Sequence, residues 1–472
     1  MEIVVGEATD DHVVDEGLLA KMEDRFFKSS CYPSTLPPET GTNEKRCIFR
    51  LPRRLKNING KWLEPQVVAL GPYHHGKPQL QMMEELKWRC LAPFMESRKG
   101  KLAACLIQLR PLEKEVRECY SESESEAINL MSTDELLQMM VIDGFFILAL
   151  FFRAKLNLTE LDRDERSIYN NPLYRLDMVI LPKIFGDLLL LENQIPSCVL
   201  NTLYTICFNI SSRKSLFVIA TNFLCSISII PESRNMPATD RLHWLHLLDL
   251  VRLVFISRAY NKAIISRAHY KKMQKTYDYR PFTLIPCVMK LRRAGIKVNR
   301  HTADSFLDVK FNNGVIKMPG LILDDSMCSL LVNCVAFEQS CNVSKSFSIY
   351  ATLLDCLVNT ARDVDYLCNR RVIDNFLGTD AEAVQFINKL GKDLTIYKDR
   401  GDSDYFFLLD VFGDVNKYYR KRLNWGKWMS FKREYFGKPW LLISAIVGFV
   451  LLVLTFLQTF YTIYAYYVHP KN

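Results

Sequence analysis

The sequence predicts a mainly α-helical protein with a small antiparallel β hairpin and one apolar helix long enough to cross a membrane. Apolar residues in the middle of the chain repeat at helical spacing and follow helix-capping residues. Between about residues 296 and 323, apolar and polar side chains alternate around an Asn-Asn-Gly turn, which is typical of a hairpin. The segment from Trp440 to Tyr467 contains no Asp, Glu, Lys, Arg or His. About 20 such residues in a helix span the hydrocarbon core of a bilayer.

Length and composition favour a large self-sufficient core. The 472 residues are 49% hydrophobic, so no disulfide or metal is needed to stabilise the fold. The 14 cysteines are scattered without a CxxC pair, and we expect reduced, mostly buried thiols. The expected organisation is an acidic flexible arm (1–44), a soluble helical domain (45–416), a basic aromatic segment (417–439), a transmembrane helix (440–467) and a short tail (468–472).

Two apolar segments in the middle of the chain are predicted to be core helices. Ser132 and Glu135 form a capping box before an apolar run that Asp143 interrupts. This run is too short to span a bilayer, so it should be buried in the protein, and Asp143 should have a partner there. The uncharged stretch from Ser215 to Ile230 is also expected to lie in the core.

The segment from Asp187 to Tyr204 is expected to begin as an apolar helix and then to change character. It reaches three polar residues, Glu192, Asn193 and Gln194, and is interrupted by Pro196. Such a trio beside a proline usually ties a helix end to neighbouring backbone groups. A ligand-binding rim is the alternative interpretation.

The hairpin is predicted from two alternating runs, SFLDVKF and VIKM, on either side of Asn312-Asn313-Gly314. A third strand, LIL, can follow Pro319-Gly320. Helices are expected to return afterwards. In one of them Thr379 and Glu382 form the N-terminal cap, and Gly391 ends the helix.

The apolar C-terminal segment carries the features of a membrane anchor. Trp440 at one end and Tyr461, Tyr464 and Tyr467 at the other are expected at the two headgroup layers. Basic residues concentrate before the span, which predicts a cytosolic domain and a tail-anchored topology. The three glycosylation sequons, at Asn157, Asn209 and Asn342, are then chance matches, and no N-terminal signal is recognisable. The basic flank consists of Lys417, Arg420, Lys421, Arg422, Lys427, Lys432, Arg433 and Lys438.

The net charge of +9 is unevenly distributed along the chain. The basic flank contains Glu434 as its only acid and is interleaved with aromatic residues, so it can lie on an anionic membrane surface. A second basic stretch, Arg252 to Arg300, can meet lipid headgroups, an acidic partner or RNA, or can be a solvated face. No RNA-binding signature accompanies it, and no nucleic acid is expected. The serine–glutamate run at Ser121 to Glu126 is expected to be a loop and a phosphorylation target.

No recognisable catalytic motif is present, because the phosphate-loop, HExxH, GxSxG and GxGxxG patterns are all missing. His74 and His75 are adjacent and could bind a metal or act as acid and base, but a hydrogen-bonded turn is the simpler interpretation. His243 and His246 are expected at i, i+3 on one helix, and Asp249 and Glu338 are isolated carboxylates. We therefore predict no catalytic residue, cofactor or metal. The motif residues without an assigned role are Gly71, Pro72, Tyr73, His74, His75, Gly76, Asp143, Glu192, Asn193, Gln194, Pro196 and Glu338.

Several ordered motifs together carry a family resemblance. They are IFRLPRRLKNINGKWLEPQVVALGPYHHGKPQL, MEELKWRCL, MMVIDGFFILALFF, LLLLENQIPSCVL, HLLDLVR, LRRAGIKV, FNNGVIKMPGLILDD and LVNCVAFEQ. With these segments and the C-terminal span, from about Cys47 to the end, the chain resembles the plant domain-of-unknown-function 247 family. Ser197 and Cys198 depart from the bulky apolar residues usual in that family after the proline.

The resemblance implies a plant protein of the plasma membrane or endomembranes. Some grass members of the family resemble pollen determinants of self-incompatibility, which implies recognition through a protein partner. The leading hypothesis is therefore a membrane-tethered recognition or signalling module. The alternative is a membrane-tethered enzyme with an unfamiliar site around His74, His75 and the trio Glu192 to Gln194, and a third hypothesis is a lipid-surface sensor that uses Arg252 to Arg300.

Overall fold

The structure is a computed structural model that describes most of the chain from residue 46 onward. The predicted acidic arm, the run at 121–125, the three sequons and residues 261–282 of the second basic stretch lie outside the described residues, as do the side chains of 424–442. The chain divides at Arg46 into Met1–Arg46 and Cys47–Asn472, and all the helices and strands below belong to the second unit. The described residues are 46–51, 60–96, 101–120, 126–153, 176, 179–207, 215–230, 243–260, 283–341, 343–392, 394, 408–436 and 439–468.

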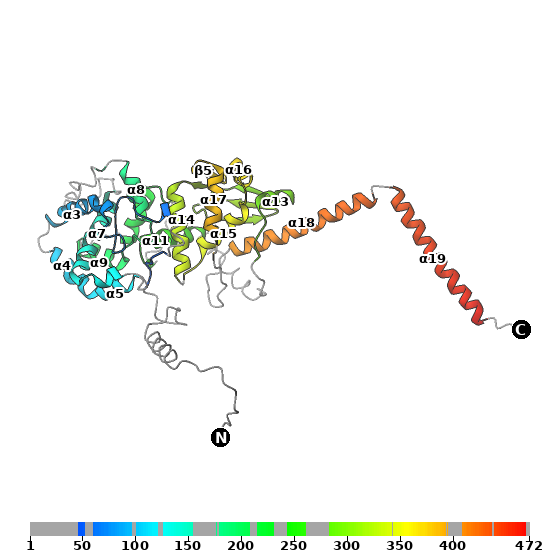
Figure 1. Cartoon of the computed structure of the whole chain (residues 1–472), viewed down its shortest axis with the longest axis horizontal. Coiled ribbons are helices and arrows are strands. Elements are labelled where there is room, and N and C mark those ends of the chain that lie inside the picture. Colours follow the sequence, from blue (N-terminus) through cyan, green and yellow to red (C-terminus); the bar gives the residue numbers. More distant parts are fainter. Residues whose placement is uncertain are drawn as a thin grey trace, which may run out of the picture. The chain divides into compact units, whose positions relative to one another are not determined.

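In the first half of this unit, the regular elements among the described residues are all helices, apart from one isolated bridge, Ile48 to Tyr120. Figure 1 shows α3, α7 and α9 grouped together in this half, and α14 lies between this group and α15 and α17. The elements are η1 (Gly60–Trp62), η2 (Pro78–Leu80), α3 (Gln81–Glu96), α4 (Lys101–Leu109), η3 (Arg110–Leu112), α5 (Glu113–Glu118), α6 (Glu126–Leu130), α7 (Thr133–Arg153), α8 (Ile180–Asp187), α9 (Ser197–Cys207), α10 (Leu216–Ser226) and α11 (Leu247–Tyr260).

Helix α7 is the central core helix that the sequence predicts. Its N-terminal box is formed, because the Ser132 backbone N–H donates to Glu135 and the Ser132 hydroxyl accepts from the Glu135 N–H. Every residue from Met139 to Phe152 is buried. The helix is therefore covered by protein on all sides rather than by lipid. Helix α10 is likewise largely buried, as expected for 215–230.

The second half combines helices with two small sheets. Its elements are α13 (Val288–Arg293), β1 (Lys297–Arg300), β2 (Lys310–Asn312), β3 (Val315–Met318), β4 (Leu321–Leu323), α14 (Asp325–Ser340), α15 (Ser346–Leu357), α16 (Ala361–Asn369), β5 (Ile373–Asn375) and α17 (Asp380–Gly391). Thr379 caps α17 through the Glu382 N–H, as predicted, and the helix ends at Gly391. One hydrophobic core joins the buried residues of both halves.

The β structure differs from a simple antiparallel hairpin. Strands β2 and β3 form the predicted hairpin around Asn313 and Gly314, whose positive φ values of 50° and 79° fit a two-residue turn. The first strand is shorter than predicted, because Ser305 to Leu307 form turns. Strand β1 then pairs with β3 in parallel, which makes the three-stranded sheet mixed. Strand β4, the predicted LIL strand, joins β5 in a separate parallel sheet, because Pro319-Gly320 redirects the chain away from the hairpin.

The expected helix at the start of Asp187–Tyr204 is wrong. Helix α8 ends at Asp187, and the non-helical residues Leu188 to Pro196 include two turns before α9 begins at Ser197. The reason is a set of side-chain to backbone hydrogen bonds that compete with helical ones. The Gln194 amide alone donates to the carbonyl oxygens of Leu188 and Leu190.

None of the described cysteines forms a disulfide, and none of them is exposed. This agrees with the expectation of mostly buried thiols. Burial raises the pKa of several of them, including Cys198 to about 12 and Cys356 to about 11.

The C-terminal part consists of two long helices, α18 (Leu408–Phe436) and α19 (Pro439–Val468). Helix α18 crosses the predicted boundary between residues 416 and 417 without interruption. Its first turns bury Leu408, Val411, Phe412 and Val415 at helical spacing, and further along the Tyr418 ring packs edge-on against Phe311 of the hairpin, 5.6 Å between centroids. The beginning of α18 is therefore part of the folded domain.

Replacing Gly314 by Ala should weaken the contact between the hairpin and α18. A Cβ at Gly314 would lie 2.7 Å from the hydroxyl oxygen of Tyr418. We expect the free energy of unfolding to fall by about 2–4 kcal/mol, of which about 1 kcal/mol comes from the positive φ and the rest from overpacking. Urea unfolding of the full chain in detergent, followed by circular dichroism, measures the loss.

Gly295 provides the matched control for this substitution. Its φ of 81° is nearly the same, but a Cβ there would meet nothing within 4 Å. Gly295→Ala should therefore cost only about 1 kcal/mol. Equal losses in the two variants would contradict a tight contact between Gly314 and Tyr418.

Candidate functional site

The motif Gly71 to Gly76 forms a turn that separates its two histidines. Gly71 has a positive φ of 69°, and a Cβ there would lie 2.7 Å from the carbonyl oxygen of Gln194, so only glycine fits. Pro72, Tyr73 and His74 are buried, whereas His75 and Gly76 are exposed. Nε2 of His74 lies 3.5 Å from Oε2 of Glu192, inside the protein. The two imidazoles therefore occupy different environments and do not form one site.

Asp143 has the buried partner that its position in α7 requires. Its Oδ1 lies 2.7 Å from Nζ of Lys87 on α3, and its Oδ2 accepts the Gly71 N–H at 2.8 Å. Lys87 also donates to Glu84 and to the Ala69 carbonyl, so three acceptors surround its ammonium group. Burial acts to lower the pKa of Lys87, but the two carboxylates outweigh it and raise the pKa, which keeps the lysine charged.

The trio at 192–194 ties the turn before α9 to distant backbone segments. Glu192 accepts the Leu51 N–H, and Asn193 accepts the Leu70 N–H at 2.7 Å and donates to the Val68 carbonyl at 3.0 Å. Oε1 of Gln194 accepts the Leu248 N–H in the first turn of α11. The trio thus has the backbone-tethering geometry that was the simpler interpretation of its sequence.

Asp187 at the end of α8 completes this polar network. Its carboxylate accepts the N–H groups of Gln66, Val67 and Val68 at 2.7–2.9 Å. Burial outweighs these three bonds and raises the pKa of Asp187 to about 6. The extended segment before Gly71 is therefore held by Asp187 and Asn193 together.

A second buried polar cluster joins the two halves of the domain. The Arg252 guanidinium on α11 lies 3.0 Å from Asp249 and 3.6 Å from Glu338 on α14. Glu338 also accepts the N–H groups of Phe347 and Ser348, so it caps the N-terminus of α15. The two carboxylates that seemed isolated in the sequence therefore share one arginine.

His243 and His246 do not lie on a helix as predicted, because α11 begins only at Leu247. His243 is exposed, whereas His246 is buried and its Nε2 lies 3.0 Å from the Cys47 carbonyl. Its Nδ1 accepts the Asp249 N–H at 3.3 Å, which requires the neutral tautomer protonated at Nε2. Desolvation lowers the pKa of His246 to about 4. The residues from Trp244 to His246 are not helical, and Ser197 at the start of α9 binds their backbone through the carbonyls of Trp244 and Leu245.

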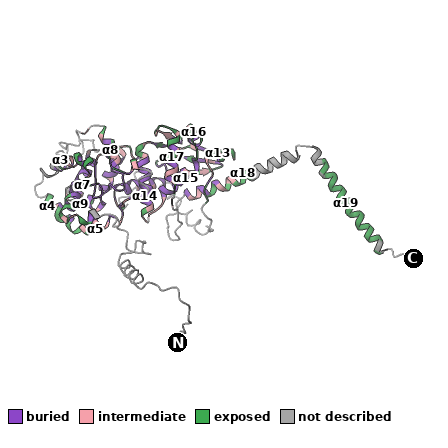
Figure 2. Cartoon of the chain, in the orientation of Figure 1, coloured by how far each residue is buried: buried purple, intermediate pink, exposed green. Residues whose placement is uncertain are grey.

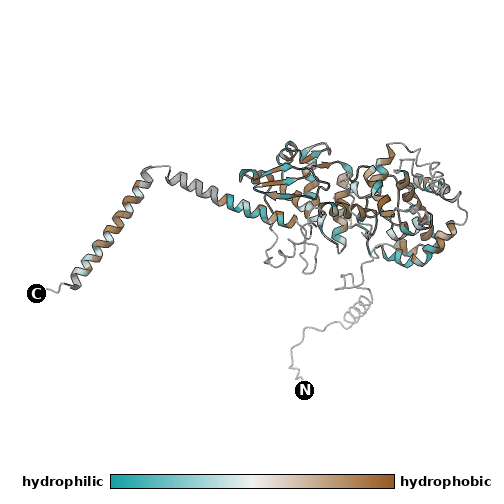
Figure 3. Ribbon diagram, turned by 180° about the vertical axis from the view of Figure 1, so that it is seen from behind, coloured by the Kyte–Doolittle hydropathy of each residue, from teal (hydrophilic) through white to brown (hydrophobic). Residues whose placement is uncertain are grey.

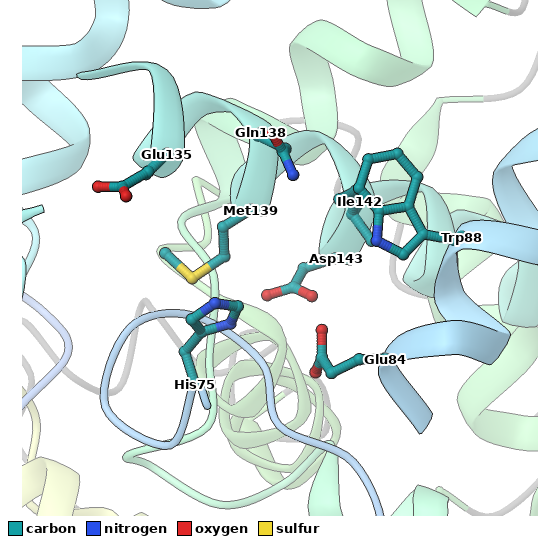
Figure 4. Close-up of a pocket in the computed structure, with 8 residues that line it drawn as sticks. All are labelled: His75, Glu84, Trp88, Glu135, Gln138, Met139, Ile142 and Asp143. Atoms are coloured by element: carbon teal, nitrogen blue, oxygen red, sulfur yellow. The ribbon is translucent and has the colours of Figure 1, made fainter. Parts of the chain in front are cut away.

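One surface pocket of about 120 Å³ lies beside the turn of His75. Figure 4 shows the side chains of His75, Glu84 and Asp143 directed toward a common space. Both oxygens of Asp143 are already bonded, so the carboxylate is not available as a base unless the Lys87 pair opens. What remains is an acidic rim with an imidazole and an indole, which suits a small cationic group. The pocket is lined by His75, Glu84, Trp88, Glu135, Gln138, Met139, Ile142 and Asp143.

Potential metal-ligand side chains are dispersed in the described part of the chain. Among those residues no three His, Cys, Asp or Glu side chains gather closely enough to hold a metal ion. Glu135 belongs to the capping box, where the Ser132 N–H and hydroxyl lower its pKa, with a smaller effect from His75. The polar groups of this region mainly satisfy backbone groups and one another.

The structure describes the side chains of only some of the predicted anchor residues. Tyr461, Tyr464 and Tyr467 are exposed on α19. Trp440 lies within the same helix, but its side chain is outside the described residues. Among the basic residues of the flank, those on the described part of α18 are exposed, whereas the side chains of Lys427, Lys432 and Arg433, and the whole of Lys438, fall outside the description. The exposed ones are Lys417, Arg420, Lys421 and Arg422.

Three structurally central residues were not singled out from the sequence: Lys87, Asp187 and Arg252. Two had a local signal, because Glu84 precedes Lys87 by three residues and Asp249 precedes Arg252 by three, both typical of helical ion pairs. Asp187 had no local signal in the sequence, because its hydrogen-bond partners lie about 120 residues away.

Removing the Asp143 carboxylate should leave the Lys87 charge and the Gly71 N–H poorly compensated. We expect Asp143→Ala to lower the free energy of unfolding by about 3–5 kcal/mol. The double variant Lys87→Met/Asp143→Leu should recover most of that loss, because it removes the buried charge along with its partner. Urea midpoints of the full chain give both values, and a double variant less stable than Asp143→Ala would contradict the role of the ion pair.

The neutral state of His246 predicts a pH dependence of stability. Its pKa of about 4 lies below the ordinary value of about 6.5, so the unfolded chain binds the proton more readily. The contribution of His246 to the free energy of unfolding is fully present above about pH 6.5. It is lost as the pH falls toward 4, and the loss amounts to roughly 2–3 kcal/mol. His246→Gln should flatten this dependence in urea unfolding between pH 7 and pH 5, whereas His75→Gln, at an exposed histidine, should leave it unchanged. A wild-type slope retained in His246→Gln would refute this assignment.

Comparison with known proteins connects these observations to a family. A family of plant proteins of unknown function, DUF247, matches residues 48–454. UPF0481 protein At3g47200 of Arabidopsis thaliana is 32% identical over 462 residues, which cover 95% of this chain and 92% of that protein. A second Arabidopsis thaliana protein, UPF0481 protein At3g02645, is 21% identical and covers 89% of this chain and 90% of its own length. No solved structure matches the chain.

The family match includes every buried motif described above, from the Gly71 turn to Glu338, and reaches into α19. The similarity to the first relative extends over almost the whole of both proteins. The chain therefore belongs to the plant domain-of-unknown-function 247 family.

Proposed function

We propose that this protein is a membrane-anchored recognition or signalling protein, held in the bilayer by α19 and binding a partner protein through its helical domain. The observation that carries the proposal is the state of α19. Its segment Ile446–Ala465 has a mean hydropathy of 2.1 and is 0% buried. A long apolar helix without protein cover is favourable only in an apolar surrounding.

Helix α7 and helix α19 have similar hydropathy but differ in burial. Helix α7 is nearly as apolar, with a mean hydropathy of 1.9, but 89% of it is buried. Figure 2 shows α19 exposed along its described length, and Figure 3 shows that the same helix is predominantly hydrophobic. Two helices of similar composition thus have opposite environments. The domain supplies the apolar surroundings of α7, and a lipid bilayer would supply those of α19.

The charge distribution supports an orientation with the domain on the cytosolic side. Lys417, Arg420 and Lys421 are exposed on α18 ahead of the apolar span. Basic residues beside a span resist translocation, and each contributes about 1 kcal/mol of attraction to an anionic leaflet. We therefore propose a single-pass protein of the plasma membrane or an endomembrane, with its helical domain in the cytosol.

A recognition role is favoured over catalysis by the use made of the motif carboxylates. Asp143, Glu192 and Glu338 each accept a backbone N–H inside the protein. Each of them is thereby engaged in stabilising the fold, which does not suit a reactive acid or base. A function in self-incompatibility is the most specific form of this proposal, and it rests on the family resemblance alone.

The pocket beside His75 favours a second candidate function, a membrane-tethered enzyme. His75 is exposed at its rim, and Glu84 and Glu135 add carboxylates that could hold a cationic substrate. The described rim contains no Ser, Cys or Lys to act as a nucleophile. This arrangement supports binding more readily than covalent chemistry.

Deleting α19 should release the protein from membranes. In plant microsomes we expect the full chain to resist carbonate extraction, and a chain ending before Pro439 to move almost entirely to the soluble fraction. Replacing Ile446–Ala465 by an unrelated polyleucine span of equal length is the matched control and should restore membrane retention. Protease added outside sealed microsomes should digest the domain if it faces the cytosol.

The partner is tested in the same material. Proximity labelling from the domain in native tissue should enrich one set of proteins for both the wild type and the polyleucine variant, because recognition resides in the domain. If the variant that ends before Pro439 stayed in the membrane fraction, α19 would not be the anchor. A correctly anchored protein without any reproducible neighbour would remove its recognition part.

A further inference from the structure

Three lysines lie on the solvent-facing side of the mixed sheet. Strand β3 pairs Lys317 with Asn299 of β1 and with Lys310 of β2. Residues that are paired across strands point to the same face of a sheet, and so do residues two positions apart along one strand. Lys297 therefore shares this face, because it stands two residues before Asn299 on β1. The opposite face points into the core, and its buried members are Val298, Ile316 and Met318.

This sheet face is cationic and poorly balanced by acids. Lys297, Lys310 and Lys317 are all exposed, and among the described residues only Lys310 of these three has an ion pair, with Asp308 at 2.8 Å. Like charges directly opposite each other on a sheet are destabilising. The placement of Lys310 opposite Lys317 is therefore unfavourable unless an anion lies over both ammonium groups. The other members of this face are uncharged: Asn299, Asn312 and Val315.

The positive charge continues onto α18, which contacts the edge strand β2. The Tyr418 ring packs on Phe311, and its hydroxyl comes close to Gly314 at the hairpin turn. At about 1.5 Å per residue, α18 extends only about 21 Å from Arg422 to its end at Phe436, shortly before α19 begins. We use the term basic surface for the three lysines of the sheet and the exposed basic residues of α18, which are Lys417, Arg420, Lys421 and Arg422.

We propose that the basic surface docks onto the anionic headgroups of the bilayer that holds α19, so that the domain lies against the cytosolic leaflet. This inference rests on the membrane anchoring proposed above and adds a docking surface and a lipid class to it. Clusters of about four to eight Lys and Arg residues beside a transmembrane helix are typical of binding to anionic lipids. The anchor also keeps such lipids at a high effective concentration, which an acidic protein in solution lacks. Charge and tethering together therefore favour a lipid surface as the occupant.

The test uses the full chain inserted into vesicles of phosphatidylcholine, with or without about 30 mol% phosphatidylglycerol, which is anionic and has no amine to consume the reagent. Brief acetylation followed by peptide mass spectrometry gives the reaction rate of each lysine. We expect Lys297, Lys310 and Lys317 to react about threefold or more slowly in the anionic vesicles, and about 0.5 M NaCl to remove this difference by screening. Lys114 on α5, whose side chain is 90% exposed, is the internal control and should react equally in both.

A charge reversal at the centre of the sheet face gives a matched pair of variants. Lys317→Glu places a carboxylate opposite Lys310, which favours the pairing of β2 with β3. The slowing at Lys297 and Lys310 should then largely disappear, while circular dichroism of the variant stays that of the wild type. Lys114→Glu makes the same change of charge outside the basic surface and should leave the slowing intact.

The outcomes separate the docking surface from the anchor. Equal acetylation rates in the two kinds of vesicle, in a chain that resists carbonate extraction, would overturn the docking surface and leave the anchor intact. Slowing of the same lysines in a chain that carbonate extracts would support the surface and remove the anchor. If polyglutamate added to the phosphatidylcholine vesicles slowed these lysines and phosphatidylglycerol did not, the occupant would be an acidic protein and the lipid proposal would be wrong.

Discussion

The buried ammonium group of Lys87 constrains how the elements of the first half pack together. A charge in an apolar interior is tolerated only when it is paired and fully hydrogen-bonded. Lys87 satisfies this condition with Asp143, Glu84 and the Ala69 carbonyl, which come from α7, α3 and the segment before the Gly71 turn. The hydrogen bonds to this one ammonium group therefore hold three parts of the chain together. The second oxygen of Asp143 extends the arrangement to Gly71, and the Gln194 carbonyl beside Gly71 extends it to the trio.

Local sequence patterns correctly predicted the elements whose stabilising contacts lie between neighbouring residues. The Ser132 box, the Thr379 cap and the Asn313-Gly314 turn were predicted correctly, since each depends on neighbouring residues. The turn at Leu188 to Gln194 was mistaken for helix because its hydrogen-bond partners are distant, at Leu51, Leu70 and Leu248. The parallel pairings of β1 and β5 were missed for the same reason, because parallel neighbours need a long connection that leaves no local signature.

The candidate site was predictable in part. The sequence drew attention to Asp143, Glu192 to Gln194 and Glu338, and all of them are buried in polar networks. It could not reveal that Glu338 and Asp249 share Arg252, because Glu338 and Arg252 are brought together only by the packing of α11 on α14. The sequence did separate α7 from α19 although their hydropathies are similar, because Asp143 interrupts the apolar run of α7. The structure covers α7 with other helices, as that interruption predicted.

The contact between Arg252 and Glu338 has a consequence for how this chain can be divided. The arginine belongs to the first half, while the carboxylate belongs to the second and holds the first turn of α15. A fragment that stops before α14 would keep the guanidinium but lose one of its two counter-charges. A fragment that starts at α14 would keep a buried carboxylate without its cation. Neither half is electrically self-contained, so we expect the two halves to fold and unfold together.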